Sequence, residues 1–250
     1  MCTLTFVPGK NSYLIGMNRD ERHTRPTAYP PRITGAGTVQ AIYPREDGGG
    51  TWIGANETGI SFALLNRNSK SGATEKLRSR GEVIPPLLES RDRRSAEQRI
   101  TSMDLRDIFA FRLVAFFPAE GAICQWNWDT EQQLEMFHLP WRARHWFSSG
   151  ISDELAREVR GLSCTEAWKQ RDAGSPAWLR NLHASHAPEQ GSFSICMHRQ
   201  DAATVSYTEI ACGSRGLVMR YRAGHPCEST DRFDSELALS LRPPAMAAAS

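Results

Sequence analysis

Apolar residues in the first part of the chain come in short runs that turn residues separate. The runs lie at residues 3–7, 13–17, 51–54 and 60–66. Runs of this length next to Gly, Pro, Asn and Asp predict β-strands joined by hairpin turns. The last run is apolar on both faces, which is typical of a strand buried between two layers. The segment between the two hairpins contains Pro30 and Pro31, and we predict a loop there.

Two later segments place apolar side chains at helical spacing among charged ones. Segment 80–107 predicts two helices, with Pro85-Pro86 near the first turn of one of them. Segment 152–187 predicts a helical block whose last helix has Ser175-Pro176 as its cap and first position. Further strands are predicted at residues 109–117, 122–126, 193–197, 204–210 and 217–221.

The order of elements is strands, helices, strands, helices and strands, joined by hairpins instead of crossover helices. Hairpins generate antiparallel sheets, and about ten strands with two separate helical blocks fit two stacked sheets between helix layers. We therefore predict an α+β fold in one domain over residues 1–242. Residues 243–250, which are mostly Ala and Pro, are predicted to form a disordered tail.

Composition and charge exclude several classes of protein. The 250 residues contain 30 Lys and Arg and 28 Asp and Glu, without the basic patch that a nucleic-acid-binding protein needs. No run approaches the roughly 18 apolar residues of a membrane span, and the first residues predict a strand instead of a signal peptide. Six scattered cysteines fit neither a disulfide scaffold nor a zinc motif. We expect reduced thiols and a cytoplasmic location, while these patterns do not define an oligomeric state.

Cys2 is the first candidate for chemistry. Initiator methionine is usually removed before a small second residue, which leaves Cys2 with a thiol beside a free α-amine. An α-amine with a pKa near ~7.7 to 8 can act as the base for its own nucleophile. The alternative interpretation is an ordinary half-buried cysteine of a β-strand.

A polar run, Asn18-Arg19-Asp20-Glu21, follows the second predicted strand. If the first hairpin turns near Lys10, Cys2 lies opposite Asn18. Arg19 could then lower the pKa of the thiol and hold a substrate carbonyl or carboxylate, and Asp20 could orient the α-amine. A solvated turn with an internal ion pair is the alternative. A shift of one residue in register exchanges the two faces of the strand.

These residues belong to a set of motifs that resembles one protein family. The motifs are Met1-Cys2-Thr3, Gly16-Met17-Asn18-Arg19-Asp20-Glu21, Arg25-Pro26, Gly49-Gly50-Thr51-Trp52-Ile53-Gly54, Ala63-Leu64-Leu65-Asn66-Arg67 and Ser79-Arg80-Gly81-Glu82. In this order, over roughly the first 85 residues, they are similar to the NRDE family, also called the transport and Golgi organisation protein 2 family. The remainder of the chain resembles that family only in its general pattern.

The NRDE family is similar in turn to the N-terminal nucleophile (Ntn) hydrolases, so the resemblance implies a four-layer αββα sandwich. The closer comparison is the cysteine branch, which includes choloylglycine hydrolases and penicillin V acylases. By that resemblance Cys2 is nucleophile and base, and Arg19 and Asp20 support it. Asn66 donates to the oxyanion, and register decides whether Asn18 also faces the thiol. The implied reaction is hydrolysis of a linear amide or acyl bond in a small molecule, without a cofactor.

One position departs from the pattern of the family. Where an asparagine is expected after the middle strands, this chain has Ser149. A shorter side chain there weakens the amidase interpretation, since one lost oxyanion donor costs about 2.7 to 4 kcal/mol, although a backbone N–H could substitute. The alternative function is a non-catalytic carrier on the same fold. The association of the NRDE family with haem trafficking and lipid handling implies haem or another apolar ligand for it.

Four further residues are of metal-ligand types, namely His183, His186, Cys196 and His198. Their spacing is loose, and histidines that pack in the core or cap a helix are the commoner explanation, so we predict no metal. The run Gly48-Gly49-Gly50 lacks the Lys-Ser/Thr of a phosphate loop and precedes a predicted strand, which indicates a turn.

Overall fold

The strands form two antiparallel sheets in the part of the chain that the computed structural model describes, residues 1–10, 12–35, 39–68, 78–129, 133–229 and 231–242. The first sheet has six strands in the order β10 (Arg144–Ser148), β1 (Cys2–Pro8), β2 (Tyr13–Arg22), β11 (Ala202–Gly213), β12 (Gly216–Ala223) and β13 (Ser235–Leu239). The second has seven in the order β3 (Tyr29–Thr34), β4 (Ala41–Arg45), β5 (Ile53–Asn56), β6 (Ser61–Asn66), β7 (Phe111–Phe117), β8 (Ala122–Trp128) and β9 (Leu134–Pro140).

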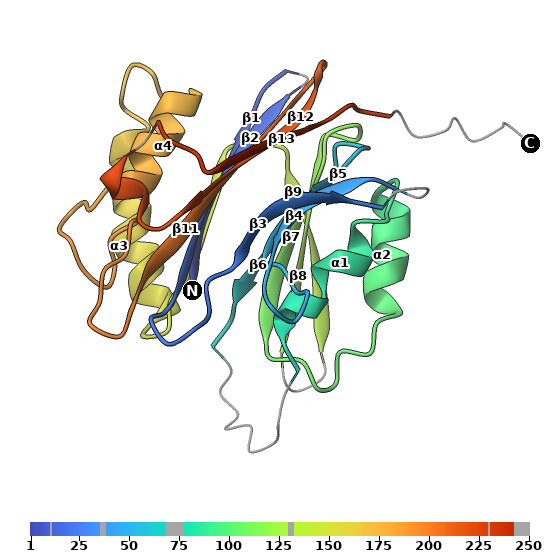
Figure 1. The fold of residues 1–250 in the computed structure, drawn as a ribbon, viewed down its shortest axis with the longest axis horizontal. Coiled ribbons are helices and arrows are strands. Elements are labelled where there is room, and N and C mark those ends of the chain that lie inside the picture. The colour runs from blue at the N-terminus through green and yellow to red at the C-terminus, as the bar shows by residue number, and fades with distance from the viewer. Residues whose placement is uncertain (11, 36–38, 69–77, 130–132, 230, 243–250) are drawn as a thin grey trace, which may run out of the picture.

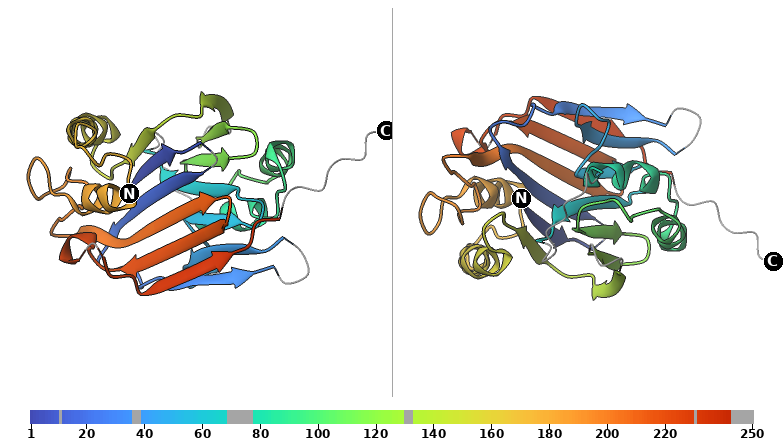
Figure 2. Two further views of the ribbon diagram at one scale, coloured as in Figure 1. Left: turned by 90° about the horizontal axis from the view of Figure 1, so that it is seen from above. Right: turned by 90° about the horizontal axis from the view of Figure 1, so that it is seen from below.

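Helices cover the outer face of each sheet, which gives four layers (Figure 1). The helices are α1 (Ile84–Leu87), α2 (Arg93–Thr101), α3 (Asp153–Ala167) and α4 (Pro176–Ala184), with short turns η1 (Arg80–Glu82) and η2 (Pro226–Glu228). The pair α3 and α4 packs on the six-stranded sheet, and α1 and α2 lie on the opposite side of the stacked strands (Figure 2). This arrangement confirms the predicted α+β sandwich. None of the described helices is both long and apolar enough to cross a membrane.

Local sequence signals place the starts of the longer helices. The Ser175 hydroxyl accepts from the backbone N–H of Trp178 at 3.1 Å, and Pro176 takes the first helical position of α4. The Ser152 hydroxyl accepts from the N–H of Leu155 at 3.2 Å and caps α3 in the same way. Each cap satisfies a backbone donor that the helix itself leaves unpaired. The predicted cap of α4 is thereby confirmed.

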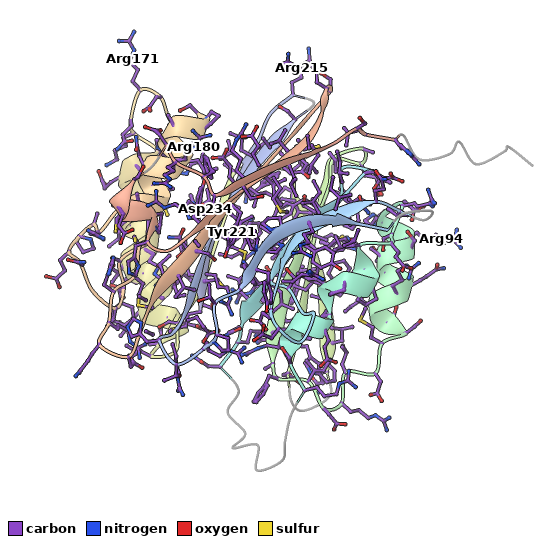
Figure 3. The ribbon with its side chains drawn as sticks, in the orientation of Figure 1. Arg94, Arg171, Arg180, Arg215, Tyr221 and Asp234 are labelled. Carbon is purple, nitrogen blue, oxygen red and sulfur yellow. The ribbon has the colours of Figure 1, made fainter. Side chains whose placement is uncertain are left out.

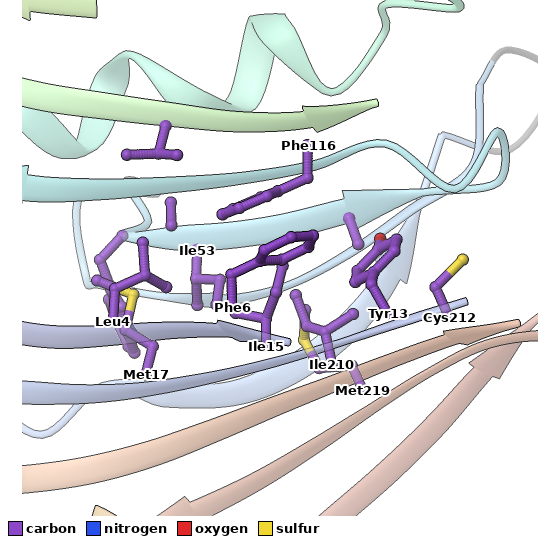
Figure 4. Close-up of a cluster of buried hydrophobic side chains, with 14 of the residues drawn as sticks. Leu4, Phe6, Tyr13, Ile15, Met17, Ile53, Phe116, Ile210, Cys212 and Met219 are labelled. Carbon is purple, nitrogen blue, oxygen red and sulfur yellow. The ribbon is translucent and has the colours of Figure 1, made fainter. Parts of the chain in front are cut away.

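A large apolar cluster lies between the two sheets (Figure 4). Phe6 of one sheet stacks on Phe116 of the other, with ring centroids 4.7 Å apart. The buried Tyr13 hydroxyl donates to the Gly59 carbonyl at 2.7 Å, so this polar atom is satisfied inside the cluster. Charged side chains such as Arg215 extend away from the sandwich (Figure 3). The shared apolar face holds the sheets together and fixes which strand ends lie next to one another.

Several elements differ from the prediction. Strand β3 passes through Pro30 and Pro31, where we predicted a loop, because an edge strand tolerates residues that lack a backbone donor. Strand β9 was not predicted, and it is largely exposed although four of its residues, Leu134, Met136, Phe137 and Leu139, are apolar. Residues 193–197 form turns instead of the predicted strand, although Ile195 is buried against the helix layer. The predicted disordered tail, 243–250, lies outside the described residues.

The buried His183 and the half-buried His145 make the stability of the fold sensitive to acid. Burial, His145 and Arg160 lower the pKa of His183 to about 3 from an ordinary 6.5, and burial lowers the pKa of His145 to about 4. The unfolded chain therefore binds protons below about pH 6.5 that the folded chain does not bind, and stability falls as the pH decreases. Between about pH 7 and about pH 5, His183 alone is expected to remove about 2 kcal/mol of unfolding free energy.

Urea unfolding across this pH range measures the effect. The exposed His138 provides the matched control, because His138→Gln leaves His183 and His145 in place and is expected to preserve the pH dependence. An unfolding free energy that stays constant from about pH 7 to about pH 5 would contradict the assignment of His183 as a neutral, buried ring.

Candidate active site

The first hairpin places Cys2 opposite Arg19, one residue away from the predicted partner Asn18. The prediction placed the turn near Lys10, and the strand pairing that follows from it is wrong by one residue. Because side chains alternate along a strand, this shift decides which face each residue occupies. Cys2 and Arg19 lie on the face between the sheets, while Asn18 and Asp20 point toward the helix layer of α3 and α4.

A cavity of about 660 Å³ opens where β1 begins. Cys2 lies in its wall with only 4% of its surface exposed. The charged residues of the lining are Arg19, Asp20, Glu21, Arg22, Arg25, Glu46 and Arg80. Asn66, at the end of β6, reaches the same cavity from the other sheet. The structure thus brings Cys2, Arg19, Asp20 and Asn66 of the predicted set together.

Arg19 is held in place from two directions. Its Nη2 lies 2.5 Å from Glu46 Oε1 and 3.4 Å from Glu21 Oε2. Its guanidinium group also lies over the Trp52 ring, 4.6 Å from the centroid, which adds a cation–π contact. These contacts fix a cation in the cavity wall directly across the strand pair from the Cys2 thiol.

Asp20 lies behind the thiol with its carboxylate completely buried. Its Oδ2 is 3.3 Å from Arg160 Nη2, and its Oδ1 accepts from the Thr204 hydroxyl at 2.7 Å. Arg160 of α3 also donates to the Thr3 hydroxyl at 2.8 Å, so it links both strands of the hairpin. Arg160 has no exposed side-chain surface. The sequence interpretation missed it because it lies in a helix far along the chain.

Asn18 does not face the thiol. Its Nδ2 donates to the backbone carbonyls of His183 and Ile195, each at 2.9 Å, and its Oδ1 lies 3.0 Å from His183 Nδ1. These bonds use both ends of the amide on the helix side of the sheet. Asn18 therefore joins β2 to α4 and to the loop that follows it.

Asn66 lies between the amino terminus and Arg80. With its carboxamide oxygen facing these donors, it accepts from Arg80 Nη2 at 3.2 Å and from the Met1 amino group at 3.3 Å. Arg80 also donates to the Ala110 carbonyl at 3.1 Å and lies over the Phe109 ring, 5.3 Å from its centroid. Among the described residues, no carboxylate comes within 4.0 Å of the Arg80 guanidinium group.

Two hydrogen bonds between Met1 and the backbone of Asp20 anchor the amino end of β1. The Met1 amino group donates to the Asp20 carbonyl at 3.0 Å, and the Asp20 N–H donates to the Met1 carbonyl at 2.8 Å. Burial raises the pKa of the Cys2 thiol, and the charge of Asp20 raises it further. The amino terminus, Arg19 and the Asp20 N–H oppose this rise without reversing it. The Cys2 thiol consequently needs a base before it can attack a substrate.

Ser149 does not replace the missing asparagine. Its hydroxyl accepts from the backbone N–H groups of Ile151 and Ser152, at 3.1 and 3.3 Å, and shapes the loop before α3. Ser148, one residue earlier, pairs with Cys2 across β10 and β1 and lies on the same face. The Ser148 hydroxyl is fully buried and has no hydrogen-bond partner among the described residues. The register therefore places a polar side chain beside the thiol on each neighbouring strand, Ser148 on β10 and Arg19 on β2.

The sequence matches the family described as Transport and Golgi organisation 2 over residues 1–200. The chain belongs to the Transport and Golgi organisation 2 family. The predicted resemblance is thereby confirmed, and the match ends before strands β11, β12 and β13. No curated protein matches this family member significantly in sequence.

Solved structures with the same fold are hydrolytic enzymes by name. An N-acylethanolamine-hydrolyzing acid amidase ortholog from Caenorhabditis elegans superposes with a TM-score of 0.56 at 10% identity, covering 84% of this chain and 92% of that one. The C2A mutant of a conjugated bile acid hydrolase from Clostridium perfringens gives 0.53 at 10% identity, covering 97% of each chain. Penicillin V acylase from Agrobacterium tumefaciens gives 0.50 at 11% identity, covering 89% and 83%. At these identities the likeness shows that the family member has the Ntn-hydrolase fold.

Proposed function

We propose that removal of Met1 converts Cys2 into the N-terminal nucleophile of a hydrolase that cleaves linear amides. The observation that carries this proposal is the set of acceptors around the amino end of β1. The amino group of Met1 lies 3.0 Å from the Asp20 carbonyl and 3.3 Å from the Asn66 oxygen, next to the thiol and the cavity. Once Met1 is gone, the α-amine belongs to Cys2, and these acceptors remain to orient it.

The reaction uses the amine as both base and acid. The α-amine takes the thiol proton, and the thiolate attacks the carbonyl carbon of the amide. Asn66 serves as the donor to the developing oxyanion. The tetrahedral intermediate forms a thioester as the leaving amine takes the proton from the α-ammonium group. Water then loses a proton to the same α-amine and attacks the thioester, which releases the acid and restores the thiol.

The charge of the cavity favours a substrate that carries an anionic group. Arg19 is already paired with two carboxylates, whereas Arg80 has a backbone carbonyl, the Asn66 oxygen and an aromatic ring as its described partners. Burial lowers the pKa of Arg80, and the charges of Cys2 and Glu21 oppose this effect. A half-buried guanidinium group of this kind is stabilised by a substrate carboxylate, which it can bind with two hydrogen bonds.

The solved structures with this fold support a hydrolase, since they include an amidase, an acylase and a hydrolase by name. All six cysteines are unpaired, which agrees with the reducing, cytoplasmic setting that we propose. A carrier of haem or of a lipid on the same fold would need an apolar cavity at this position. The cavity next to Cys2 is instead lined by four arginines and three acidic residues.

The test is a panel of N-acyl amino acids and their matched carboxamides, with the intact mass measured on the same sample. Protein without Met1 is expected to release the free amine and to prefer the carboxylate member of each pair. Arg80→Gln should raise KM for the carboxylate substrate about 10- to 100-fold, because a charged hydrogen bond contributes about 1.5–3 kcal/mol. KM for the carboxamide should change little.

The exposed Arg78, two residues away, is the matched control, and Arg78→Gln is expected to leave both KM values unchanged. Retention of Met1 in the purified protein would exclude the α-amine as base. Failure to cleave any amide of the panel by protein that has lost Met1 would reject the hydrolase proposal itself.

A further inference from the structure

Four potential metal ligands from three segments meet at the end of α4. They are His186 just after the helix, Cys196 and His198 in the loop before β11, and Cys227 in η2. One ligand atom from each of them lies within 4.8 Å of every other. The sequence interpretation had grouped His183 with the first three. His183 instead turns to Asn18 and Thr5, and Cys227 takes its place.

The contacts converge on a single nitrogen. His198 Nε2 lies 3.2 Å from His186 Nε2, 3.5 Å from Cys196 Sγ and 3.5 Å from Cys227 Sγ. An imidazole nitrogen carries either one N–H or one lone pair, so it makes one well-directed hydrogen bond. Ordinary hydrogen bonding therefore satisfies at most one of these three contacts. A cation at the centre of the four atoms would satisfy all of them together.

The spacing agrees with tetrahedral coordination. A zinc ion with bonds of about 2.3 Å to sulfur and about 2.0 to 2.1 Å to nitrogen holds its ligand atoms about 3.3 to 3.8 Å apart at tetrahedral angles. Both nitrogen–sulfur contacts at His198, at 3.5 Å, lie within this range, and the nitrogen–nitrogen contact, at 3.2 Å, lies just below it. Two thiolates and two neutral imidazoles also balance the charge of a divalent cation. We propose that His186, Cys196, His198 and Cys227 bind one Zn²⁺ in a closed, structural site.

The backbone around these residues holds the ligands close together without the ion. The Cys196 N–H donates to the Ser185 carbonyl at 2.9 Å, and the Met197 N–H donates to the Thr204 hydroxyl at 2.8 Å. The same hydroxyl donates to Asp20 at 2.7 Å. The zinc site would therefore tie the loop after α4 to η2, and through Thr204 it would support the buried carboxylate behind Cys2. This role is structural, because no ligand of the proposed site lines the cavity at Cys2.

The chemistry of the four side chains favours zinc over other cations. Thiolate and imidazole ligands suit Zn²⁺, whereas Mg²⁺ and Ca²⁺ prefer oxygen ligands. A Cys₂His₂ set leaves no open position, as in structural zinc sites. The competing explanation is a disulfide between Cys196 and Cys227. The intact mass of the protein before reduction separates the two explanations, since a disulfide would consume both thiols and prevent metal binding.

The experiment measures zinc bound by the whole chain. Wild-type protein incubated with zinc sulfate under reducing conditions and then desalted is expected to retain one Zn²⁺ per chain by elemental analysis. Titration with Co²⁺ should give thiolate-to-cobalt absorption, which reports the sulfur ligands directly. Cys227→Ser, at a half-buried position, is expected to bind Zn²⁺ at least about 100-fold more weakly. Its circular dichroism spectrum checks that the variant is folded.

Cys164→Ser supplies the matched control, because Cys164 is a buried thiol of α3 outside the cluster. It should retain as much zinc as the wild type and give the same cobalt spectrum. Three results would overturn the proposal. The first is a wild-type protein with reduced thiols that retains no zinc, and the second is a Cys227→Ser variant that retains as much zinc as the wild type. The third is a Cys196–Cys227 disulfide in the intact mass of the protein as isolated, before any reductant is added.

Discussion

Replacing Cys2 by alanine is expected to lower kcat/KM for the best amide substrate by about 10⁴-fold or more, because alanine offers no nucleophile to form the acyl-enzyme. Alanine is small enough that Met1 should still be removed, so the variant keeps the α-amine and loses only the thiol. The measurement is the steady-state rate of amide hydrolysis, combined with the intact mass of each protein.

Cys212→Ala is the matched control for this substitution. Cys212 belongs to the same sheet and the same apolar cluster, and its exposure of 5% is close to the 4% of Cys2. Both variants lose one buried thiol, so they should lose similar stability, while only Cys2→Ala should lose activity. A Cys2→Ala protein that hydrolyses amides at the wild-type rate would remove Cys2 from the mechanism.

The same pair of variants separates an enzyme from a carrier. A carrier would bind its ligand with similar affinity with or without the thiol, and the wild type would show no turnover. An enzyme would bind substrate in both forms, but only the wild type would release product. The comparison therefore tests catalysis and binding on one pair of proteins.

Short-range patterns in the sequence were sufficient to predict the first hairpin and part of the candidate site. The turn residues and apolar runs predicted the first hairpin, and three residues of the motifs, Cys2, Arg19 and Asn66, line one cavity in the structure. The error at Asn18 arose from one residue of register in that hairpin. A strand buried on both faces gives no alternation of polar and apolar residues, so the pattern could not correct the register.

Contacts between distant segments were beyond the reach of the sequence. Arg160 lies in a helix 140 residues from Asp20, and nothing in its own segment indicates a buried cation. The sequence interpretation considered only Ser149, whereas the pairing of β10 with β1 places its neighbour Ser148 on the face of Cys2. The sequence interpretation also missed Cys227 as a ligand of the proposed zinc site, because η2 approaches α4 only in the folded chain. In each case a contact between segments that are far apart in the sequence decides the role.

Replacing Arg160 by methionine is expected to lower the free energy of unfolding by about 3–5 kcal/mol. Both side chains of the Arg160–Asp20 pair have no exposed surface, so the substitution leaves a buried carboxylate without its cation. Urea unfolding measures the loss. Arg157 lies one turn earlier on the exposed face of the same helix, and Arg157→Met should change stability by less than about 0.5 kcal/mol.

The double variant Arg160→Met with Asp20→Asn identifies the origin of that loss. Asparagine keeps an acceptor for the Thr204 hydroxyl and carries no charge, so the double variant should be more stable than Arg160→Met alone. If the two are equally unstable, the loss comes from the Arg160 bond to Thr3 and from packing instead of from the unpaired charge. Thr3 lies next to Cys2 on β1, and Asp20 lies next to Arg19, the partner of Cys2 on β2. If Arg160→Met loses amide hydrolysis and the double variant regains it, the Cys2 nucleophile requires that no unpaired charge is buried behind it. It then does not require the Arg160–Asp20 ion pair itself.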